Sequence, residues 1–151
     1  MMKAYAEERI SAGERRLVVD LGACTGMDST FMGTLAGIAA RLSALDEGGT
    51  LQIAEPGERN RRSLEDLGLD FLMDIDPPAA SWRGSIDTIR AALDAPQTGP
   101  LPRPQQARHV LEAHQTLSDL NPENAREFEG VVKTLEREIA KDEPTGNPRQ
   151  D

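Results

Sequence analysis

Three consecutive residues with side-chain oxygen atoms, Asp28, Ser29 and Thr30, follow a glycine-rich turn and precede apolar residues at helical spacing. Side chains of this kind cap helices, because their oxygen atoms accept hydrogen bonds from the unpaired N–H groups of the first turn. A hydroxyl at a helix N-terminus can also accept a phosphate, since the helix dipole stabilises negative charge there. From these residues alone, a structural cap is the favoured interpretation. Asp28 could itself be the cap, which would leave the Ser29 hydroxyl free.

The turn before these residues, over residues 20–26, has a second interpretation. Its acidic residue and alternating glycines resemble the first motif of the Rossmann-like S-adenosylmethionine methyltransferases, in which glycines let the ligand approach the backbone. Here Cys24 stands at the middle glycine position. The next acidic strand end, Glu55, lies 35 residues after Asp20, where about 20 would be expected in comparable nucleotide-binding folds. These departures make a methyltransferase-like protein the weaker alternative.

No other combination of side chains predicts catalysis or metal binding. The single cysteine, Cys24, excludes an intrachain disulfide framework and a cysteine-rich zinc site. His109 and His114 are five residues apart and therefore on different helix faces, whereas a metal-binding pair would prefer four, so we interpret both as surface residues. No Ser/His/Asp set or pair of catalytic carboxylates stands out. We expect no enzymatic activity, no cofactor and no metal.

The hydrophobic pattern predicts strands that alternate with helices. Residues 17–21 predict a buried strand, and residues 51–54 and 71–75 predict two more. Helices are expected after residues 28–30, over residues 59–67 up to Gly68, and over residues 82–93. The alternation predicts an α/β fold with a small mixed or parallel sheet and helices packed on it. Small residues in the first of these helices, such as Gly33 and Gly37, are expected to allow close packing on the sheet.

The C-terminal third has a different organisation. Four prolines fall within residues 96–104 and predict an extended linker. Residues 105–141 then predict an α-helical hairpin, amphipathic on both arms, with a break at Asn121-Pro122. We therefore divide the chain into an α/β domain at residues 1–95, the linker at 96–104, the hairpin at 105–141 and a flexible tail at 142–151.

One stretch carries a more specific resemblance. Residues 27–35 (MDSTFMGTL) follow a strand that ends in Asp20-Leu21 and open a helix. The arrangement resembles the STAS domain, the fold of anti-sigma factor antagonists, and the later elements occur in the family's order. The resemblance covers about residues 17–93.

This resemblance implies regulation by protein contact. In anti-anti-sigma factors of this family, an anti-sigma factor that is also a GHKL-type ATPase and serine kinase phosphorylates the first motif serine, and a PP2C-type phosphatase reverses the modification. Carried onto this chain, the phosphate acceptor is Ser29. Asp28, Thr30, Phe31 and Met32 belong to the partner-contact surface. The unphosphorylated form would sequester the anti-sigma factor and release a bacterial sigma factor, in the cytoplasm.

The chain departs from the family pattern at two places. Phe31 stands where the family usually has a small residue, and residues 1–16 leave room for the helix before the first predicted strand but not for the two strands that normally precede it. Either the true start lies upstream, or the sheet is reduced; a reduced sheet would have an open edge, for which the helical hairpin is a candidate cover. The alternative function is a STAS scaffold or sensor subunit that binds no anti-sigma factor.

Composition limits the kinds of partner. The net charge of −9 opposes a phosphate backbone, and an aromatic content of 3% leaves little to stack on unpaired bases, so nucleic acid is not an expected partner. We expect no membrane association, because no apolar run is long enough to span a bilayer and the N-terminal residues are too charged for a signal peptide. Homo-oligomer formation is left open.

Overall fold

The computed structural model describes residues 2–94 and 101–142. Its centre is a parallel sheet of β1 (Arg16–Asp20), β2 (Thr50–Ala54) and β3 (Asp74–Ile75), in that order. Arg16 pairs with Thr50, and Gln52 pairs with Asp74. The expected α/β fold with a small parallel sheet is confirmed, because each connection between neighbouring strands passes through a helix.

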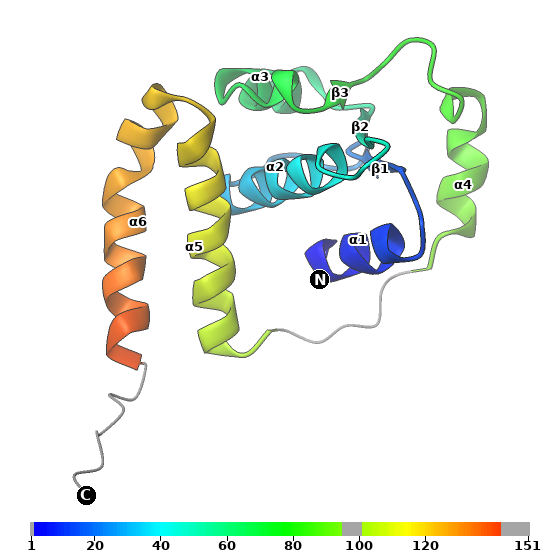
Figure 1. Cartoon of the computed structure of the whole chain (residues 1–151). Helices are drawn as coiled ribbons and strands as arrows, with labels where there is room; N and C mark the ends of the chain where they lie inside the picture. The colour runs from blue at the N-terminus through cyan, green and yellow to red at the C-terminus, as the bar shows by residue number, and fades with distance from the viewer. Residues whose placement is uncertain (1, 95–100, 143–151) are drawn as a thin grey trace, which may run out of the picture.

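Helices pack around this sheet in the α/β part (Figure 1). α1 (Met2–Ser11) packs against α2 (Ser29–Ser43), and α2 packs against β2. α3 (Glu58–Asp66) is followed by Gly68, whose φ of 79° is a left-handed conformation that glycine adopts without strain. The helix boundaries expected at residues 28–30 and at Gly68 are therefore confirmed.

Two strand predictions need correction. The third strand is shorter than residues 71–75, because Leu69–Phe71 forms a 3₁₀-helix (η1) and only Asp74–Ile75 pairs with β2. The first strand is not buried: Val18 is 41% exposed, and Leu17 and Val19 are half-buried. β1 lies at the edge of the sheet, where a strand has a neighbour on one side only. The helical pattern at residues 82–93 forms a 3₁₀-helix, η2 (Arg83–Ser85), and α4 (Ile86–Ala92).

The helical hairpin consists of α5 (Arg103–Leu120) and α6 (Pro122–Asp142), which lie side by side and cross the end of α2 steeply in Figure 1. α5 thus begins inside the stretch expected as linker, and α6 reaches the first residue expected as tail. Residues 95–100 and 143–151, which hold most of the expected linker and tail, lie outside the described residues. The hairpin packs on α2 and not on the sheet edge, so its predicted role as an edge cover is wrong.

The hydrophobic core extends from the sheet into the hairpin. Leu51 and Ile53 of β2 and Leu35 of α2 are fully buried in it, and so is Leu117 of α5. Phe128 of α6 belongs to the same cluster. Because fully burying one such side chain contributes roughly 1.5–3 kcal/mol, the hairpin is bound to the α/β part by apolar contacts of considerable strength. Within the described ranges, no helix combines the length and the hydropathy needed to cross a membrane.

Candidate functional site

The N-terminus of α2 is capped by Asp28. Its backbone is extended, with φ −93° and ψ 171°, and its Oδ1 accepts a hydrogen bond of 2.8 Å from the backbone N–H of Phe31. Asp28 is exposed, and Ser29 is the first residue of the helix. The cap function therefore belongs to Asp28, which the sequence left as one alternative, and the hydroxyl of Ser29 is available for another contact.

That contact is with the hairpin. Ser29 Oγ lies 2.8 Å from Nε2 of His114 in α5, and Nδ1 of the same ring lies 2.7 Å from the carbonyl oxygen of Val110. A carbonyl only accepts, so Nδ1 carries the proton. In the neutral ring Nε2 is then the acceptor, and the Ser29 hydroxyl donates to it. The His114 ring also packs edge-on against Phe128 of α6, with the ring centroids 5.4 Å apart.

The interpretation of the two histidines as surface residues is wrong. His114 is only 4% exposed, and His109 is half-buried. Nε2 of His109 lies 3.2 Å from Oγ1 of Thr34, whose hydroxyl donates to the carbonyl oxygen of Thr30 and therefore accepts from the imidazole. Burial, reinforced by the Lys3 ammonium, holds the pKa of His109 below its usual value of 6.5. Both histidines contact α2, although they point in different directions around α5.

The other predicted contact residues are divided between the surface and the core. Thr30 and Phe31 are half-buried and line, with Asp28, a cavity of about 360 Å³. Met32 is only 8% exposed and packs in the hydrophobic core. Met32 therefore offers no surface to a partner in this structure, and its assignment as a contact residue needs correction: at this position the helix turns its side chain inward.

Gly33 marks the closest approach of α2 to the hairpin. A Cβ atom at Gly33 would lie 2.3 Å from the carbonyl oxygen of Ala113. Since real Cβ atoms do not come so close to backbone atoms, only glycine allows this crossing. The small residues of α2 thus serve packing as expected, but at Gly33 the neighbour is α5 and not the sheet. The glycine inside an amphipathic helix is a sequence signal for close packing, but it does not show which element packs there.

The family model of the STAS domain matches residues 2–81, from α1 to just before η2. This chain belongs to the STAS domain family. Matches to the chain are found neither among curated proteins nor among solved structures. The STAS match contains Ser29 and the whole of α2, whereas α5 and α6 lie outside it. The motif serine of the STAS domain is therefore covered by a segment that is not part of the family's pattern.

Beside the motif, the glycine turn of the STAS domain is held by α4. Arg90 donates to both carboxylate oxygens of Asp20, at 2.5 and 2.8 Å, and to Glu55 at 2.5 Å. The Arg90 guanidinium holds the pKa of Asp20 below its usual range. A Cβ at Gly22 would lie 2.3 Å from Nη2 of Arg90, so this side chain fills the space above the turn. Membership of the STAS family, together with this occupied turn, favours the STAS interpretation over the methyltransferase.

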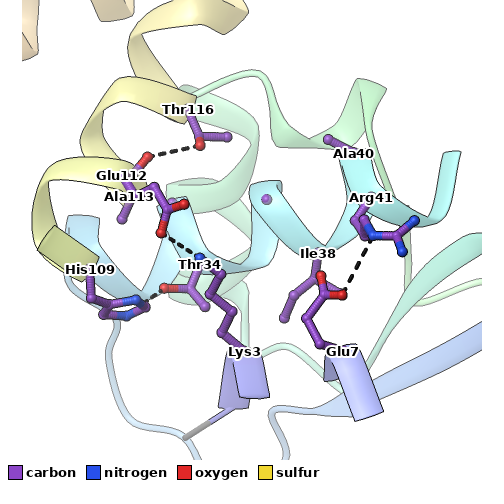
Figure 2. Close-up of a pocket in the computed structure, with 12 residues that line it drawn as sticks. Lys3, Glu7, Thr34, Ile38, Ala40, Arg41, His109, Glu112, Ala113 and Thr116 are labelled. Atoms are coloured by element: carbon purple, nitrogen blue, oxygen red, sulfur yellow. Dashed lines mark hydrogen bonds and ion pairs between the residues drawn. The ribbon is translucent and has the colours of Figure 1, made fainter. Parts of the chain in front are cut away.

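A cavity of about 290 Å³ next to the motif is lined by residues of α1, α2 and α5 (Figure 2). Two ion pairs cross its rim: Lys3 with Glu112, and Arg41 with Glu7 at 3.5 Å. The histidine at its end, His109, is the one bonded to Thr34. Among the residues that the structure describes, no group of three or more His, Cys, Asp or Glu side chains could hold a metal ion.

Proposed function

We propose that this protein is an anti-sigma factor antagonist whose binding to its anti-sigma factor is switched by phosphorylation of Ser29. The observation that carries the proposal is the position of Ser29. It is the first residue of α2 in a STAS domain, and Asp28 has already satisfied the helix cap. A phosphate on this hydroxyl would add a charge of about −1.5 to −2 at a helix N-terminus, which stabilises an anion.

The proposed partners follow from the family. A GHKL-type ATPase would act as both anti-sigma factor and serine kinase, and a PP2C-type phosphatase would remove the phosphate. Asp28, Thr30 and Phe31 would contribute to the contact surface, and the site of action would be the bacterial cytoplasm. The protein itself would be a substrate of the kinase and not an enzyme.

Two measurements test this proposal. Tandem mass spectrometry of the protein from its own cells, growing and stressed, should find phosphate on Ser29 in amounts that change with condition. In a pull-down with a candidate GHKL-type ATPase, the wild type and Ser29→Ala should be retained, whereas Ser29→Asp should not. Ser43→Asp, a matched change at the exposed C-terminal end of α2, should be retained. An unmodified Ser29 under every condition, with equal retention of all four proteins, would contradict the switch.

One observation favours the scaffold alternative. The Ser29 hydroxyl is bonded to a buried histidine, so in this conformation it is not presented to a kinase. A scaffold would show no phosphorylation, and its pull-down would contain only STAS-domain chains.

A further inference from the structure

The hairpin occupies the part of α2 that bears the motif serine. α5 contributes His114, whose Nε2 lies 2.8 Å from the Ser29 hydroxyl oxygen and accepts its hydrogen bond, and α6 contributes Phe128, which packs edge-on against the same ring. His114 is 4% exposed and Phe128 is 8% exposed. The hydroxyl of the half-buried Ser29 is therefore bonded to a buried ring, in a part-buried contact between two residues that are 85 positions apart in the chain.

This contact has little room for adjustment. At Gly33, one turn along α2 from Ser29, the backbones of α2 and α5 are as close as a glycine permits. At the turn between the hairpin arms, the buried Asn124 side chain donates to the carbonyl oxygens of Leu67 at 2.9 Å and Leu117 at 3.0 Å. The hairpin is thus fastened at both ends of its contact with the α/β part, and a group inserted between Ser29 and His114 would have to move α5 as a whole.

A phosphate on Ser29 is such a group. Transfer from ATP forms a bond between Ser29 Oγ and the γ-phosphorus, breaks the bond from that phosphorus to the ADP oxygen, and releases the hydroxyl proton to solvent. The hydrogen that the serine donated to His114 is then gone. Nδ1 of His114 stays bonded to the carbonyl oxygen of Val110, so the ring is held in place facing the modified serine. Placing the charge of a phosphate in the 2.8 Å contact between Ser29 and the buried His114 ring, with little access to water, costs free energy.

We propose that the α5–α6 hairpin is a cover that docks on α2 only while Ser29 is unmodified, so that phosphorylation of Ser29 and docking of the hairpin exclude each other. The inference rests on the proposed phosphorylation of Ser29 and adds its structural consequence. The hairpin opens to expose the serine, and the phosphate then keeps it open. Opening uncovers the α2 face around Gly33 and the apolar inner side of the hairpin, including Leu117 and Phe128, which are buried in the docked state.

The test needs no kinase. The full chain is produced with phosphoserine placed at position 29 by an expanded genetic code, and amide hydrogen exchange of residues 103–142 is compared with that of the unmodified chain by mass spectrometry. We expect α5 to exchange about tenfold faster or more in the phosphorylated chain, while β2 and α3 keep their protection. Phosphoserine at position 43, at the exposed end of α2, should leave α5 unchanged. Unchanged exchange of α5 in the position-29 protein would overturn the proposal.

If phosphoserine at position 29 unfolds the whole chain, two variants with smaller side chains test the proposal instead. Ser29→Asp and Ser29→Asn have nearly equal volume and differ in charge. The aspartate should speed the exchange of α5 and the asparagine should not; equal exchange in the two variants would overturn the proposal. Faster exchange of α5 with phosphoserine or aspartate at position 29, together with an unmodified Ser29 in cells, would refute the proposed function. It would still show that a negative charge at position 29 and docking of the hairpin exclude each other.

Discussion

Gly33 of α2 and Ala113 of α5 define the closest crossing between the STAS domain and its C-terminal hairpin. The Cβ atom that any other residue would add at position 33 would lie 2.3 Å from the Ala113 carbonyl oxygen and 2.6 Å from its carbon. Both atoms are backbone and cannot rotate away. The attachment of the hairpin therefore depends on the absence of a single methyl group.

Gly33→Ala should consequently destabilise the protein by about 1–3 kcal/mol, because α5 must move to make room for the methyl group. Gly37→Ala is the matched control: it lies one turn further along the same helix, and a Cβ there meets nothing within 4 Å. Alanine is the better helix former by up to about 1 kcal/mol, so Gly37→Ala should be neutral or stabilising. Urea denaturation of both variants measures the difference, and equal stability would show that α5 is not held at this crossing.

The bond between Ser29 and His114 should have a measurable energy of its own. Ser29→Ala leaves the Nε2 lone pair of a buried ring without a donor, which should cost about 1–3 kcal/mol. The exposed Ser43 serves as control, and Ser43→Ala should change the free energy of unfolding by less than about 0.5 kcal/mol.

A double-mutant cycle separates this bond from other effects of the two substitutions. With Ser29→Ala and His114→Phe, we expect a coupling energy of about 0.5–1.5 kcal/mol from urea denaturation of the four proteins. Additive effects of the two substitutions would mean that the hydroxyl and the ring do not interact in solution.

Much of the α/β part was predictable because its signals are local. Asp28 caps α2 as its side chain suggested, Gly68 ends the α3 unit in a left-handed conformation, and the alternation of elements gave a parallel sheet. The motif at residues 27–35 also identified the family that the match over residues 2–81 confirms. Each of these predictions depends on residues close together in the chain.

The errors concern contacts between distant segments. His114 looks like a surface residue from its spacing to His109, but α5 packs on both α2 and α6, which buries the ring between Ser29 and Phe128. Met32 was assigned to the partner surface with its neighbours in the motif, but the helix turns it into the core. Hydrophobic periodicity predicts that a face is covered without predicting by what, so the sequence offers the hairpin only as a candidate cover for the sheet edge, whereas it packs on α2.

Asn124 should be the most sensitive polar residue of the hairpin. It is 1% exposed, and its amide group donates to the carbonyl oxygens of Leu67 and Leu117. Asn124→Ala removes both donors and should cost about 1–3 kcal/mol. Asn124→Asp keeps the shape but turns a charged acceptor toward two carbonyls, so at neutral pH we expect a larger loss, about 3–5 kcal/mol. Urea denaturation distinguishes the two variants, and an aspartate no worse than alanine would indicate that this contact is open to water.

His109 should make the stability of the protein depend on pH between neutral and mildly acidic conditions. Its pKa in the folded protein lies below its usual value of 6.5, chiefly because of burial and then because of the Lys3 ammonium, although the nearby Glu112 opposes the shift. The folded state therefore binds this proton less readily than the unfolded state. Above the unfolded pKa both states are neutral, and the full stability is present. As the pH falls below the unfolded pKa toward the folded one, the unfolded state takes up the proton first, and stability is lost.

His109→Gln isolates this effect from the other titrating groups. Glutamine keeps an N–H donor for the Thr34 hydroxyl and does not titrate. Urea denaturation at about pH 7.5 and about pH 5.5 should show a smaller loss of stability for the variant than for the wild type. The difference should grow as the pH is lowered and level off below the folded pKa. An identical pH dependence in the two proteins would place the His109 ring in water, with α5 further from α2 than the 3.2 Å contact with Thr34 requires.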